Sequence, residues 1–86
     1  MYLFFMNLNN LCEFPHEVFI PLENNVYLEG RITINTNKEF FVSEVDIVFK
    51  ESRKIWKHIG LILDKENPTE AFDAGMIILS NFVAGS

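Results

Sequence analysis

The segment from residue 67 to residue 83 constrains the fold more than any other part of the chain. Asn67 can cap a helix, Pro68 suits the first helical position because its missing N–H costs nothing there, and Glu70 stands three residues after the cap. This pattern predicts a helix that begins at Pro68. At about 100° per residue, its apolar side chains share an arc of about 160°, so the helix needs a broad apolar surface to lie on. The arc contains Ala71, Phe72, Gly75, Met76, Ile78, Leu79, Phe82 and Val83, and Ile77 falls outside it.

Three upstream segments have the alternating apolar and polar residues that are typical of half-buried strands. The first is short, Val18 to Ile20, and the prolines on either side of it suit an edge strand. The second, Val26 to Asn35, directs Val26, Leu28, Ile32 and Ile34 to one side, and its Gly30 marks either a bulge or a place where a bulky neighbour crosses closely. The third is Phe40 to Lys50. Turns of a few residues join the three, so we expect an antiparallel meander.

Residues 55 to 64 fit a helix and a strand about equally well. The spacing of their apolar residues favours a helix, since Ile55, Trp56, Ile59, Ile62 and Leu63 share an arc of about 120°. The composition favours a strand, because isoleucine, tryptophan, histidine and glycine are poor to middling helix formers. The link formed by residues 51 to 54 could also close a hairpin. Both alternatives stay open at this point.

The expected fold is a single small α+β domain, residues 1–86. An antiparallel sheet of three or four strands packs on the C-terminal helix, because each needs the other to bury its apolar face. A second short helix is an option near the N-terminus, where Phe4, Leu8, Leu11 and Cys12 have helical spacing. Met6 is an alternative start of the chain.

The apolar content is high for a chain of 86 residues: 49% of them are hydrophobic, including nine Phe and one Trp. A small domain buries only about 60% of its unfolded surface, so part of this apolar load should remain exposed as an interface. We expect the face of the sheet turned away from the helix to carry it, through Phe40, Val42 and Val48. The formal charge is −5, yet Lys50, Arg53, Lys54 and Lys57 cluster around Trp56 and His58 in a short basic segment.

The sequence carries no catalytic or cofactor signature. Cys12 and His16 are four residues apart, but the intervening Pro15 interrupts a helix, and an inert buried thiol is the favoured interpretation. The four glycines are isolated, so no phosphate-binding loop is present. Glu44 and Asp46 are interpreted as a solvated strand face, with cation or partner binding as the alternative. We therefore expect no enzyme, no cofactor and no metal.

The single cysteine rules out an internal disulfide and favours the cytoplasm, and no apolar run approaches the roughly 20 residues that span a bilayer. The leading hypothesis is a small protein-binding module, either an inhibitor, an immunity-type or adaptor protein, or a self-associating subunit. The alternative is weak nucleic-acid binding through the basic segment, which the overall acidity makes unfavourable. The predicted partner-binding residues are Phe40, Val42, Val48, Lys50, Arg53, Lys54, Trp56 and Lys57.

Overall fold

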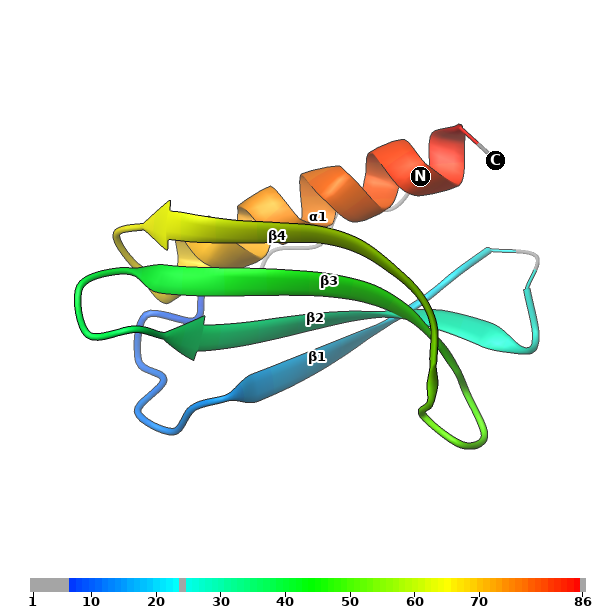
Figure 1. Ribbon diagram of the computed structural model, residues 1–86, viewed down its shortest axis with the longest axis horizontal. Helices are drawn as coiled ribbons and strands as arrows, with labels where there is room; N and C mark the ends of the chain where they lie inside the picture. The colour runs from blue at the N-terminus through cyan, green and yellow to red at the C-terminus, as the bar shows by residue number, and fades with distance from the viewer. Residues whose placement is uncertain (1–6, 24, 86) are drawn as a thin grey trace.

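The computed structural model describes residues 7–23 and 25–85 and shows four strands followed by a helix (Figure 1). All neighbouring strands are antiparallel, and they lie in the sheet in the same order as in the chain. The fold is therefore α+β, a four-stranded meander packed against one C-terminal helix, as the sequence predicts. The elements are β1 (His16–Pro21), β2 (Leu28–Thr36), β3 (Phe41–Phe49), β4 (Ile55–Lys65) and α1 (Pro68–Ala84).

The helix α1 begins as predicted. Asn67 has extended backbone angles, and its side-chain oxygen accepts a hydrogen bond of 2.9 Å from the Glu70 N–H. The Glu70 carboxylate in turn accepts one from the Asn67 side chain at 3.2 Å, so the cap satisfies donors at both positions. Ile77 is exposed, as its place outside the apolar arc indicates. Within the described part of the chain, no helix has both the length and the apolar character needed to cross a membrane.

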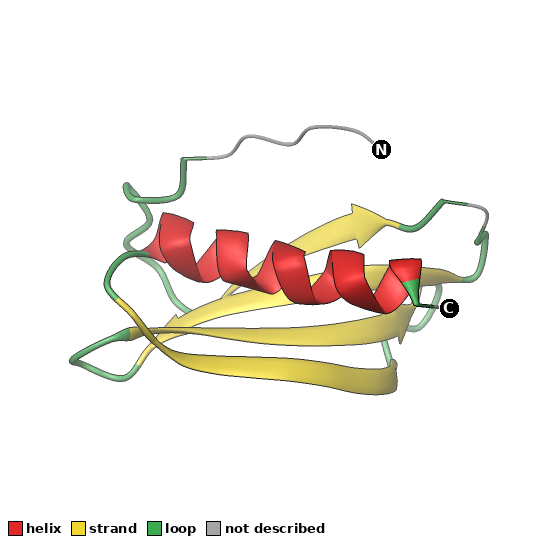
Figure 2. Cartoon of the chain, turned by 90° about the horizontal axis from the view of Figure 1, so that it is seen from above, coloured by secondary structure: helices red, strands yellow, loops and turns green. Residues whose placement is uncertain are grey.

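The helix lies across one face of the sheet, where it packs mainly on β2, β3 and β4 (Figure 2). Three glycines let the two layers approach closely. A Cβ atom on Gly30 would lie 2.7 Å from Leu79, one on Gly60 would lie 2.8 Å from Ile78, and one on Gly75 would lie 2.6 Å from the Ser43 hydroxyl. The expected close crossing at Gly30 is thus confirmed. The core of this inner face contains Leu8, Ile20, Ile32, Ile34, Val45, Ile47, Ala71, Phe72 and Leu79.

Residues 55 to 65 form a strand, which resolves the ambiguity in the sequence. The pairing of β3 with β4 shifts at three places. Positions 45 and 46 of β3 face Gly60 and His58, so Ile59 is an extra residue in β4; a second shift leaves Trp56 extra, and a third lies between Phe41 and Ser43. Each irregularity breaks the period of two that marks a regular strand. The apolar residues of β4 therefore acquire a spacing that resembles that of a helix.

The structure corrects three expectations near the N-terminus. Leu8, Leu11 and Cys12 form no helix, and Cys12 is exposed rather than buried. Leu8 instead donates its backbone N–H to Thr69 Oγ1 at 2.9 Å, which ties this segment to the start of α1. Val26 is 73% exposed because β2 begins only at residue 28. Phe4 and Met6 lie outside the described residues.

Candidate functional site

The β3–β4 hairpin bends over the outer face of the sheet, the face turned away from α1 (Figure 1). Arg53 in its turn adopts a left-handed backbone conformation, with a φ of 62°. Its Nε lies 3.1 Å from the Glu29 carboxylate on β2, and its Cζ lies 3.7 Å from the centre of the Phe19 ring on β1. The guanidinium thus combines an ion pair with a cation–π contact. These two contacts fasten the hairpin across the outer face.

The burial of two side chains overturns two expectations for the outer face. Val48 and Asp46 are fully buried, so Val48 is not part of an exposed apolar surface and Asp46 is not solvated. The alternating pattern predicts an open outer face, because nothing in it shows that the hairpin bends. Phe40 is 38% exposed in the turn before β3, and Val42 is half-buried. The predicted surface is therefore reduced to these two residues.

Asp46 lies at the centre of an ion network on the outer face. Its Oδ2 is 3.0 Å from Arg31 Nη2, and its Oδ1 is 2.8 Å from His58 Nδ1. Arg31 Nη1 also pairs with Glu17 at 3.4 Å, and the Glu44 carboxylate lies 3.9 Å from His58 Nδ1. A buried carboxylate is strongly disfavoured without such partners. Both oxygens of Asp46 are thus engaged.

The basic segment does not form one surface. Arg53 is engaged with Glu29, and His58 is engaged with Asp46. Lys57 faces the helix side, where its Nζ lies 5.7 Å from the centre of the Phe82 ring. Of the four basic residues predicted as partner-binding, Lys50 and Lys54 are exposed and form no ion pair or cation–π contact within the described part of the chain. The structure separates residues that are adjacent in the sequence.

Large exposed apolar side chains gather instead where the β1–β2 and β3–β4 hairpins end. Val26 and Tyr27 are 73% and 76% exposed, and with Phe49 and Lys50 they line a shallow hollow of about 500 Å³. The Lys50 N–H donates to the Tyr27 carbonyl oxygen at 2.8 Å, which joins the two hairpins. Ile55 and Trp56, which are 54% and 49% exposed, begin β4 just after the turn of the β3–β4 hairpin. We name this surface the hairpin-end patch; it comprises Val26, Tyr27, Phe49, Ile55 and Trp56.

Of the patch residues, only Trp56 is among the partner-binding residues predicted from the sequence. The period of two groups Val26 with Leu28, Ile32 and Ile34 on one side of the strand, but this period does not hold before the regular strand begins at residue 28. The available signal was the position of Val26 and Tyr27 directly after the polar residues 23–25. Residues that follow a turn signal lie at the end of a hairpin, where side chains are commonly exposed.

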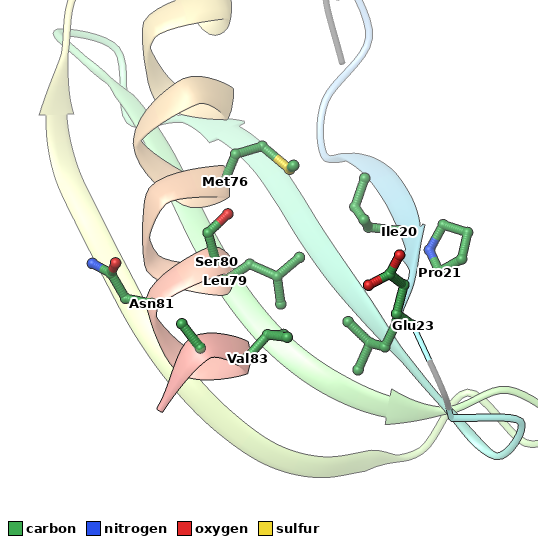
Figure 3. Close-up of a pocket in the computed structure, with 10 residues that line it drawn as sticks. Ile20, Pro21, Glu23, Met76, Leu79, Ser80, Asn81 and Val83 are labelled. Carbon is green, nitrogen blue, oxygen red and sulfur yellow. The ribbon is translucent and has the colours of Figure 1, made fainter. Parts of the chain in front are cut away.

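A second hollow lies between β1 and the last turns of α1. Since α1 packs mainly on the other three strands, the inner side of β1 is less covered at this end. Figure 3 shows Met76, Leu79 and Val83 directed from the helix toward Ile20. The groove has a volume of about 450 Å³, and Pro21 and Glu23 stand at its opposite wall. It is mainly apolar and presents no cluster of catalytic groups among the described residues.

Comparison of the chain with protein family models, with curated proteins and with solved structures finds no match. The function of this chain is therefore inferred from the geometry of its surface.

Proposed function

We propose that this protein is a small non-enzymatic protein-binding module that works in the cytoplasm. It acts as an inhibitor, an immunity-type or adaptor protein, or a self-associating subunit, and the hairpin-end patch is its main contact surface. The observation that supports this function is the concentration of five large apolar side chains, each at least 40% exposed, at one end of a small domain. Large exposed apolar side chains that gather in one region are typical of interaction sites.

The composition of the hairpin-end patch suits a protein partner. Tyrosine and tryptophan are common energetic anchors of interfaces, because they bury a large area at a small cost in conformational entropy. Lys50 and Lys54 are exposed beside them and supply a polar rim. Such a rim complements acidic groups on a partner and orients its approach.

The edge strand β4 extends this surface. As the last strand of the sheet, it has backbone groups along one side that pair with no other strand among residues 7–23 and 25–85. Leu61 and Leu63 are 51% and 55% exposed further along it. A strand from another chain could therefore pair with β4 while its side chains cover these leucines, a common mode of protein recognition.

The test compares the patch with an exposed apolar residue elsewhere. Tyr27→Ser combined with Trp56→Ser removes two anchors, and Ile77→Ser removes a similarly exposed side chain from α1. We expect the double variant to lose self-association in light scattering, or to lose the partner that the wild type recovers. Ile77→Ser should retain it. A strictly monomeric wild type without a recovered partner, or equal recovery by both variants, contradicts the proposal.

Nucleic-acid binding through Lys50 to His58 has less support, because these side chains lie on different sides of the sheet. Backbone phosphates bind where several cations line one surface. Filter binding at low salt decides the matter. Retention by the wild type that is lost in a Lys54→Ala, Lys57→Ala variant would replace the protein-binding proposal with this one.

A further inference from the structure

The cluster around Asp46 brings together the donor atoms of a metal site. Glu44 and Asp46 are two residues apart on β3, and His58 lies directly opposite Asp46 on β4. One ligand atom from each of these side chains lies within 4.8 Å of the other two. We propose that Glu44, Asp46 and His58 bind a divalent first-row transition metal ion, for which Zn²⁺ is the probe.

Two of the donor-atom separations are near that of a zinc site, and the third is no more than 4.8 Å. Ligand atoms around a tetrahedral Zn²⁺ lie about 3.3 Å apart when each bond is about 2.0 to 2.1 Å long. His58 Nδ1 is 2.8 Å from Asp46 Oδ1 and 3.9 Å from Glu44 Oε2, so the two observed distances lie on either side of this value. The side chains of His58 and Glu44 are about half exposed and can adjust, whereas Asp46 is fixed by burial.

Asp46 is oriented as a metal-binding carboxylate would be. Arg31 holds its Oδ2 at 3.0 Å, which leaves Oδ1 directed at His58. Glu17 holds Arg31 in turn. Carboxylates that ligate metals are commonly hydrogen-bonded by a second group that sets their direction. The guanidinium therefore positions the ligand without occupying the oxygen that would bind the ion.

The charge and donor types of the cluster favour a divalent transition metal. Glu17, Glu44 and Asp46 carry three negative charges and Arg31 carries one positive charge, so the cluster has a formal charge of −2 when the imidazole is neutral. A divalent cation neutralises it. One imidazole nitrogen with two carboxylate oxygens suits zinc and its neighbours, whereas magnesium and calcium prefer oxygen ligands alone. The exposed side of the cluster leaves room for water as a further ligand.

The experiment is a calorimetric titration of the full chain with ZnCl₂. Cys12→Ser serves as the background, because the exposed Cys12 thiol is a competing zinc ligand. We expect one ion per chain. His58→Gln should weaken binding about 100-fold or more, and Glu44→Gln about tenfold or more, since even an outer-shell partner of a metal site is worth about 10- to 100-fold. His16→Gln, a change of the other histidine, is the matched control and should leave the affinity unchanged.

A second measurement separates metal binding from folding. Zinc should raise the melting temperature of the background protein and of His16→Gln, but not that of His58→Gln. Absence of zinc binding, unchanged binding in His58→Gln, or an equal loss in His16→Gln overturns the proposal. Should His58→Gln fail to fold, the zinc affinity of Glu44→Gln decides the proposal. Glu44 is half exposed, and the glutamine amide retains the shape of the side chain, so this variant should fold. The site does not depend on the hairpin-end patch, so either proposal can fail alone.

Discussion

The two faces of the sheet are both closed to solvent at their centres, but by different means. On the inner face, Ile32, Ile34 and Val45 are fully buried beneath α1, which the glycines allow to approach closely. On the outer face no second layer is present among the described residues. There, Asp46 is buried by its own ion partners, and the bent hairpin with its Arg53 contacts covers the same face.

Burial on the inner face depends on the area of apolar contact, whereas burial on the outer face depends on the orientation of charged groups. An apolar contact layer gains free energy in proportion to the surface removed from water, so many side chains share the effect. An ion network depends on a few oriented pairs, and each broken pair leaves a charge without its partner. We therefore expect the inner face to respond to changes in volume and the outer face to respond to changes in charge.

Phe72→Ala tests the inner face and should have the largest effect. Phe72 is among the largest fully buried side chains, and its truncation removes apolar contacts and leaves a cavity. We expect the free energy of unfolding to fall by about 3 to 5 kcal/mol. Urea denaturation followed by circular dichroism measures the change. Ile77→Ala, at an exposed position of the same helix, should shift it by less than about 0.5 kcal/mol, and an equal loss in both variants contradicts the assignment.

Asp46→Asn tests the outer face without a change in volume. The amide keeps the shape of the side chain but leaves Arg31 and His58 without their buried anion. We expect a loss of about 2 kcal/mol in the free energy of unfolding, since hydrogen bonds to charged groups are worth about 1.5 to 3 kcal/mol. The same urea titration measures it. A variant as stable as the wild type would show that the network is not a stabilising element of this face.

Gly30→Ala tests the fit between the two layers. The added methyl would lie 2.7 Å from the Leu79 side chain, which must move. We expect a loss of about 1 to 2 kcal/mol. In a Leu79→Ala background the cost of Gly30→Ala should fall, because the obstructing group is gone, and a double-mutant cycle of unfolding free energies measures this coupling. Strictly additive effects would place the strain elsewhere.

Glu17→Gln removes the charge of Glu17, the more exposed of the two carboxylates that contact Arg31. This substitution should have the smallest effect on stability. The Glu17 side chain is about half exposed, and its distance to Arg31 is 3.4 Å. We expect a loss of about 0.5 kcal/mol at low salt. At about 1 M NaCl the difference between variant and wild type should vanish, since salt screens exposed pairs. A loss of stability that persists at high salt would show that Glu17 behaves as a buried member of the network.

The helix and the regular strands could be predicted from local chemistry. Asn67, Pro68 and Glu70 identify the helix start because the cap depends on residues three apart, and the structure contains that contact. The strand β4 could not be assigned with the same method. Its extra residues, Ile59 and Trp56 among them, are defined by the pairing with β3, which a single sequence does not display.

The ion network could not be predicted from the sequence for the same reason. His58 approaches Asp46 only if residues 55 to 65 form a strand in this register, and the sequence left that choice open. The bend of the β3–β4 hairpin, which accompanies the burial of Val48, likewise depends on contacts of Arg53 with two other strands. Periodicity reports which residues share a face of one element. It does not report what crosses that face from elsewhere.

The meander order of the strands also bears on how fast the chain reaches its structure. Every strand pairs with the one that follows or precedes it in the chain, and each connection is a short loop. Closing short loops costs little chain entropy, and chains rich in local pairings fold faster than chains with distant ones. We therefore expect refolding to be rapid for a protein dominated by β-structure, with hairpins able to form before α1 docks across them.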